Sequence, residues 1–159
     1  MDSNKMGFDH KVYSSEADLK PEFRKLIALA VSQLDKAYAP YSSFLVGAAL
    51  LLDDGTTYVG CNQENASFPL CMCAERVALY SLGADQSKFN IQAIAITAKN
   101  LKKEHKGYCM PCGACRQVIQ EFEQRQGGPI TLLLAGEAGK VMQIEGIDKI
   151  LPLSFSIDD

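Results

Sequence analysis

The apolar residues of this chain form two patterns: a helical spacing in some segments, and short, almost continuous runs typical of buried strands in others. After Pro21, apolar residues recur at helical spacing, which predicts a first helix that ends before Pro40. The run 44–52 is almost wholly apolar, and a second short run, 56–61, follows a D-D-G turn sequence at 53–55. We therefore expect two strands joined by a tight turn.

The second half of the chain alternates between helical and extended segments. A charged loop is expected over 98–110, helices over 74–82 and 113–125, and strands over 91–97, 130–134 and 141–144. The predicted order is αββαβαββ. Strands that are apolar on both faces need helices above and below them. This pattern predicts an α/β fold, an α/β/α sandwich around a central mixed sheet of about five strands.

Length and composition are those of one globular domain. The 159 residues are 47% hydrophobic and 22% charged, and no linker or repeat divides them. We expect a flexible N-terminal tail over 1–16 and a single domain over 17–159. No apolar run approaches the roughly 18 to 20 residues of a membrane span, and the N-terminus lacks the apolar core of a secretory signal. These features predict a cytoplasmic protein without a membrane partner.

The net charge of −3 provides no electrostatic footprint for a phosphate backbone. We therefore expect a small-molecule substrate and no nucleic-acid partner.

The cysteines offer the strongest chemical signal. Cys112 and Cys115 form a C-x-x-C pair whose thiolates can converge on one tetrahedral ion, and Cys73, at another predicted helix start, supplies a third ligand. Three protein ligands leave the fourth position of a zinc ion open for water, as in catalytic sites. The dipoles of both helix starts should lower the thiol pKa values. The alternative is a structural zinc closed by Cys71 or Cys109.

Glu75 stands two residues after Cys73, beside the expected metal. The C-A-E and P-C-x-x-C elements together match the signature of zinc deaminases. In that chemistry a zinc-bound hydroxide attacks C4 of cytosine, and the carboxylate moves one proton to ring N3 and a second to the departing amine. The alternative for Glu75 is an acid favoured in a first helical turn by the helix dipole.

Two arginines adjoin these residues. Zinc with three thiolates has a formal net charge of −1, which weakens its acidifying effect on water. Arg76 and Arg116 can each donate hydrogen bonds to a thiolate sulfur and offset this charge, and we favour Arg76. Either residue could instead be an exposed helix residue.

At these motifs the chain resembles the small homotetrameric, zinc-dependent cytidine deaminase family. The resemblance rests on AYAPYSSFLVGAALL (37–51), GCNQENASFPLCMCAERVAL (60–79), PCGACRQV (111–118) and LPLSF (151–155). It implies hydrolysis of free cytidine and deoxycytidine to uridine and deoxyuridine plus ammonia, in pyrimidine salvage. It also implies one Zn²⁺ per subunit and a homotetramer whose active sites are completed by neighbouring subunits.

The resemblance implies substrate contacts as well. Asn62 and Glu64 correspond to residues that bind the ribose hydroxyls, and alternate residues of an extended segment do point to the same side. The alternative is that both are turn and surface residues.

Other positions match residues that contact the base or a neighbouring site. Phe44 corresponds to an aromatic residue that packs on the pyrimidine, and the Ala74 backbone to a contact with the base. Phe68, where the family often has Tyr, and Phe155 correspond to residues that line a neighbouring subunit's site. The alternatives are a core role for Phe44 and a tail anchor for Phe155.

Other functions share part of this pattern. A deaminase of a different aminopyrimidine would keep the C-A-E and P-C-x-x-C elements, but the N-Q-E segment favours a ribose. A nucleic-acid editor would use the same zinc chemistry, against the acidic charge of the chain. A zinc-stabilised binding domain would retain the metal without releasing ammonia.

Overall fold

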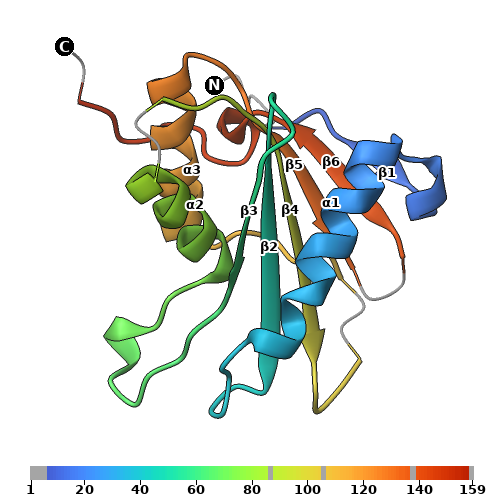
Figure 1. Cartoon of the computed structure of the whole chain (residues 1–159), viewed down its shortest axis with the longest axis vertical. Coiled ribbons are helices and arrows are strands. Elements are labelled where there is room, and N and C mark those ends of the chain that lie inside the picture. The colour runs from blue at the N-terminus through green and yellow to red at the C-terminus, as the bar shows by residue number, and fades with distance from the viewer. Residues whose placement is uncertain (1–6, 86–87, 105–106, 137–138, 158–159) are drawn as a thin grey trace, which may run out of the picture.

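In a computed structural model, which describes residues 7–85, 88–104, 107–136 and 139–157, the chain forms a mixed sheet between two layers of helices (Figure 1). The strands are β1 (Lys11–Tyr13), β2 (Phe44–Leu52), β3 (Thr57–Cys61), β4 (Ile91–Asn100), β5 (Thr131–Ala135) and β6 (Val141–Glu145). The helices are α1 (Pro21–Ser32), α2 (Ala74–Asp85) and α3 (Gly113–Gln126). The strand order is β1-β6-β5-β4-β2-β3, and β4 and β5 pair in parallel while the other neighbours are antiparallel.

The two faces of the sheet carry side chains of different size. On β4, Ala93 and Ala95 pack in the cluster that includes α1, whereas Ile94 and Ile96 pack in the cluster that includes α2 and α3. The small side chains let α1 lie close to the sheet: a Cβ atom added at Gly47 would be 2.0 Å from the carbonyl oxygen of Ala30. Side chains of alternate residues point to opposite faces, so one strand sequence supports both layers.

The start of α2 lies equally close to the other face. A Cβ atom added at Gly60 of β3 would be 2.3 Å from the carbonyl oxygen of Ala74, the first residue of α2. Glycine is needed there because the two backbones touch. This contact fixes the distance between the sheet and the start of α2, where Cys73 and Glu75 lie.

The α/β fold with a mixed sheet confirms the sequence prediction, but the sheet has six strands among the described residues instead of about five. The additional strand, β1, pairs with β6 and lies inside segment 1–16, which the sequence predicts to be a tail. Residues 1–6 of that segment lie outside the described residues. A three-residue strand is too short to show a periodicity, and its pairing depends on the exposed edge of β6.

Strand β4 is also longer than its predicted range of 91–97. It continues to Asn100 because its last three residues pair with the first three of β2. The predicted loop over 98–110 therefore begins three residues later, and its residues 105–106 lie outside the described part of the chain. Among the helices that the structure describes, none has the length and apolar character needed to cross a membrane.

Candidate metal centre and its cavity

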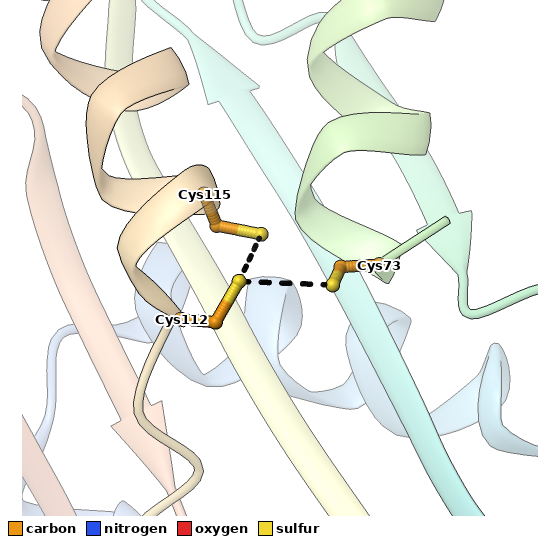
Figure 2. Close-up of side chains that lie close together, drawn as sticks. All are labelled: Cys73, Cys112 and Cys115. Atoms are coloured by element: carbon orange, nitrogen blue, oxygen red, sulfur yellow. Dashed lines mark hydrogen bonds between the residues drawn. The ribbon is translucent and has the colours of Figure 1, made fainter. Parts of the chain in front are cut away.

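Three cysteines from two helix starts meet at one point (Figure 2). The Sγ atoms of Cys73 and Cys112 are 3.9 Å apart, and those of Cys112 and Cys115 are 3.5 Å apart. All three Sγ atoms lie within 4.8 Å of one another. Cys73 directly precedes α2, Cys112 is the N-cap of α3, and Cys115 is in the first turn of α3. Both helices therefore direct the positive ends of their dipoles toward the sulfur atoms.

The sulfur atoms strongly affect one another's protonation. Hydrogen bonding from the Cys115 thiol, assisted by Arg76, lowers the pKa of Cys73 to about 5 against the effect of burial. The same hydrogen bond and burial raise the pKa of Cys115. In this arrangement Cys73 is the first of the two to become a thiolate, which is the ligand form of cysteine.

The donor set fits a zinc ion. Thiolates are ligands that zinc prefers, and three of them leave one tetrahedral position open. Among the described residues, the candidate metal-binding group consists of Cys73, Cys112 and Cys115. Of the two possible fourth ligands, the Cys71 thiol forms hydrogen bonds with the backbone of Asn65. Cys109 is buried, and burial raises its pKa to about 12, which keeps it protonated.

Glu75 is a buried acid beside this cluster. It is the second residue of α2 and is 3% exposed. Burial raises its pKa to about 7, and the negative charge of Cys73 adds to the effect. A carboxyl group in such surroundings can hold a proton or release it near neutral pH.

The two candidate arginines have different partners. Arg76 donates from Nη2 to Cys73 Sγ over 3.6 Å, and this hydrogen bond raises the pKa of the guanidinium. Arg116 donates to two backbone carbonyls instead, from Nε to Pro111 and from Nη1 to Ile150, each at 2.8 Å. The sequence analysis named both arginines as candidate donors to a sulfur atom and favoured Arg76, which is the one that donates to Cys73 in the structure.

A cavity of about 310 Å³ opens beside the cysteines. Its lining includes Glu75 and three of the residues expected to bind substrate: Phe44, Asn62 and Glu64. Four cysteines also line it: Cys73 and Cys112 of the cluster, and Cys71 and Cys109. The sequence analysis did not identify several further lining residues, which have no distinctive spacing and come from separate segments: Ser42, Val46, Gln63, Met72 and Met110.

The polar side chains of the cavity are held by backbone groups. The side-chain amide of Asn62 accepts from the N–H of Val46 at 2.8 Å and donates to the carbonyl of Phe44 at 2.9 Å. Glu64 Oε2 accepts from the N–H groups of Tyr41 at 2.8 Å and Ser42 at 3.3 Å. A hydrogen bond from the Ser42 side chain, together with these two backbone hydrogen bonds, lowers the pKa of Glu64 against the effect of burial, so it is a carboxylate at neutral pH.

The other residues that were predicted to contact substrate are not among the described residues that line this cavity. Ala74 is fully buried at the start of α2, between Cys73 and Glu75. Phe68 and Phe155 are 67% and 71% exposed and are not among the residues that line the cavity within the described chain. Neither side chain therefore lines the cavity within the described part of its own chain.

Comparisons with known proteins identify the family of this chain. The protein-family model described as the cytidine and deoxycytidylate deaminase zinc-binding region matches residues 21–126 of this chain. A cytidine deaminase of Sporosarcina psychrophila is 40% identical over 138 residues, which are 87% of this chain and 94% of the relative. A cytidine deaminase of Mycobacterium tuberculosis is 38% identical over 77% of this chain and 81% of its own length.

A solved structure shows the same fold. The crystal structure of cytidine deaminase from Burkholderia pseudomallei aligns with a TM-score of 0.72 and 41% identity, over 82% of this chain and 97% of that one. The chain belongs to the cytidine and deoxycytidylate deaminase family.

Proposed function

We propose that this protein is a zinc-dependent hydrolase that converts free cytidine and deoxycytidine to uridine and deoxyuridine, with release of ammonia. The observation that supports this most directly is the three-cysteine cluster with the buried Glu75 beside it, at a cavity of about 310 Å³. A cavity of this size is within the range of small-molecule sites. The cytidine deaminases among its relatives match most of the chain.

The proton transfers are assigned to Glu75. When held by Cys73, Cys112 and Cys115, zinc supplies Lewis acidity, which lowers the pKa of water from 15.7 to about 7. Glu75 takes a proton from the water that attacks C4 and delivers it to ring N3. It then passes the second proton to the departing amine, so that one water is consumed and one ammonia is released. Arg76 offsets the excess negative charge by donating to Cys73.

The substrate is oriented by side chains that the backbone already holds in place. Asn62 has a second amide hydrogen and Glu64 has further lone pairs beyond the hydrogen bonds described above. We assign these groups to the ribose hydroxyls, the ring of Phe44 to the face of the pyrimidine, and the backbone of Ala74 to the base. Groups that are fixed before binding lose little freedom when the nucleoside enters.

We also propose that the active protein is a homotetramer with one zinc per subunit. Phe68 and Phe155 are large apolar side chains with most of their surface exposed, and Leu153 beside Phe155 is fully exposed. Exposed apolar groups of this kind are typical of surfaces that pack against a partner. In the proposed assembly, both phenylalanines line the site of a neighbouring subunit.

The proposed location is the cytoplasm, in pyrimidine salvage. Reducing surroundings keep cysteines as free thiols, which a three-thiolate metal site requires. A nucleoside as substrate is consistent with a salvage role.

The decisive experiment compares wild type with Glu75→Gln. Conversion of cytidine to uridine is followed by ultraviolet absorbance, and zinc is measured by elemental analysis. We expect Glu75→Gln to keep its zinc and lose roughly 10²- to 10⁴-fold in kcat, the usual contribution of a positioned acid or base. Wild-type turnover by the glutamine variant, or zinc-loaded wild type without turnover of any cytosine nucleoside, would contradict the proposal.

Parallel substrates separate the alternatives. Free cytosine tests whether the ribose is required, and a single-stranded oligonucleotide containing cytosine tests the nucleic-acid editor. Turnover of either at the rate of cytidine would point to a different substrate class.

A further inference from the structure

Cys112 differs from the other two cysteines in how it is held. Cys115 is fully buried and Cys73 is half-buried, whereas Cys112 is exposed. It is the N-cap of α3, and its side chain makes no capping hydrogen bond. Figure 2 shows it at the point where the incoming loop joins the helix. Packing therefore does little to fix this sulfur, and its position depends on the backbone of the turn.

Arg116 holds that backbone on both sides of Cys112. Its Nε donates to the carbonyl of Pro111, the preceding residue, at 2.8 Å, and its main-chain N–H donates to the carbonyl of Cys112 itself at 2.9 Å. Pro111 is buried, so its carbonyl needs a partner inside the protein. The guanidinium supplies that partner from one turn further along the same helix.

The same guanidinium also binds the C-terminal segment. Nη1 of Arg116 donates to the carbonyl of Ile150 at 2.8 Å, and the neighbouring Gln117 donates from Nε2 to the carbonyl of Phe155 at 2.8 Å. One planar group thus joins the turn before Cys112 to a segment 34 residues away in sequence. A lysine cannot reproduce this, because arginine presents several donors in a fixed fork and lysine only a point charge.

We propose that Arg116 is a positioning residue, which fixes the turn of the Cys112 ligand and links the C-terminal segment to it. This inference rests on the proposed function, in which the three cysteines hold zinc. Loss of the guanidinium leaves the buried carbonyl of Pro111 without its donor and frees the most exposed ligand to move. Zinc then leaves the protein faster.

The test measures zinc release from the zinc-loaded protein. Zinc transfer to the chelator pyridylazoresorcinol is followed by absorbance, and unfolding by urea is measured for each variant. Loss of a group that supports a metal ligand usually weakens metal affinity roughly 10- to 100-fold, so we expect Arg116→Ala to release zinc faster by a factor of that order. Arg116→Lys should fall between Arg116→Ala and wild type, because one ammonium can satisfy one of the two carbonyls.

Two controls separate positioning from general loss of stability. Gln117→Ala removes only the hydrogen bonds of the neighbouring side chain and should release zinc at the wild-type rate. Arg125→Ala removes an arginine from the far end of α3, where it stacks on Phe89 and Phe122, and should lower stability without faster release. Release from Arg125→Ala as fast as from Arg116→Ala, at an equal loss of stability, would overturn the proposal.

The remaining outcomes are equally decisive. Arg116→Ala with the wild-type release rate overturns the inference while leaving the zinc enzyme intact. If Arg116→Ala does not fold, Arg116→Lys decides in its place: faster release supports the role and the wild-type rate overturns it. Wild type that contains no zinc by elemental analysis overturns the proposed function, and with it this inference.

Discussion

Replacement of Gly60 by alanine tests whether the contact between β3 and α2 sets the position of the Glu75 carboxylate, to which we assign the proton transfers. The new Cβ would be 2.3 Å from the carbonyl oxygen of Ala74 and 2.7 Å from the backbone nitrogen of Ala78, whereas ordinary contacts begin near 3.4 Å. Both atoms belong to the backbone and cannot turn aside. One of the two backbones must therefore shift, by about 1 Å to reach ordinary contact, and we expect the start of α2, which positions Cys73 and Glu75, to be the part that moves.

This displacement has two measurable consequences. Overpacking of this kind costs about 1–3 kcal/mol of stability, which urea unfolding measures. A misplacement of about 1 Å at reacting groups can reduce turnover about 100-fold, which the ultraviolet assay measures. We therefore expect Gly60→Ala to fold, to be less stable, and to lose about two orders of magnitude in kcat.

A matched variant lies on the opposite face of the same sheet. The Cβ of Gly47→Ala would be 2.0 Å from the carbonyl oxygen of Ala30 in α1, a helix without site residues. We expect a comparable loss of stability with kcat retained by the folded protein. Gly128→Ala adds a Cβ with no atom within 4 Å and should change neither quantity. Wild-type turnover in Gly60→Ala, or equal loss of turnover in Gly47→Ala, would refute the reasoning.

Two further predictions concern groups outside the catalytic step. Glu123 accepts hydrogen bonds from the N–H groups of Ile130 and Ile147 at 2.8 and 3.0 Å, yet burial raises its pKa above the ordinary 4.5. The Glu123 carboxyl therefore keeps its proton to a higher pH in the native state than in the unfolded chain. As pH rises above 4.5, the free energy of unfolding that Glu123 contributes falls. Glu123→Gln should remove that part of the pH dependence in urea unfolding, and an unchanged slope would contradict the assignment. Iodoacetamide in mildly alkaline buffer should modify the half-buried Cys71 before the buried Cys109, because burial raises the pKa of Cys109 to about 12. Mass spectrometry of the digested protein measures the order of modification. Modification of Cys109 first would show that this thiol is accessible.

The fold class and the proximity of the C-x-x-C cysteines can be predicted from patterns along the chain. The apolar residues of 91–97 predict a buried strand, and the structure confirms it, with Ala93 and Ala95 packed on one face and Ile94 and Ile96 on the other. The C-x-x-C spacing brings Cys112 and Cys115 together because one helical turn separates them. Such features depend on neighbours along the chain, so local pattern is sufficient to predict them.

Other features depend on contacts between segments that are distant in sequence, and the folded chain is needed to see them. Cys73 joins a cysteine 39 residues away, and strand β1 pairs with an edge that only the folded sheet presents. Arg116 adjoins Cys115 in sequence, and adjacency suggested a sulfur partner, but its side chain reaches two carbonyls instead. A sequence gives the donors that a side chain has, whereas the acceptors within its reach are brought there by the packing of the whole chain.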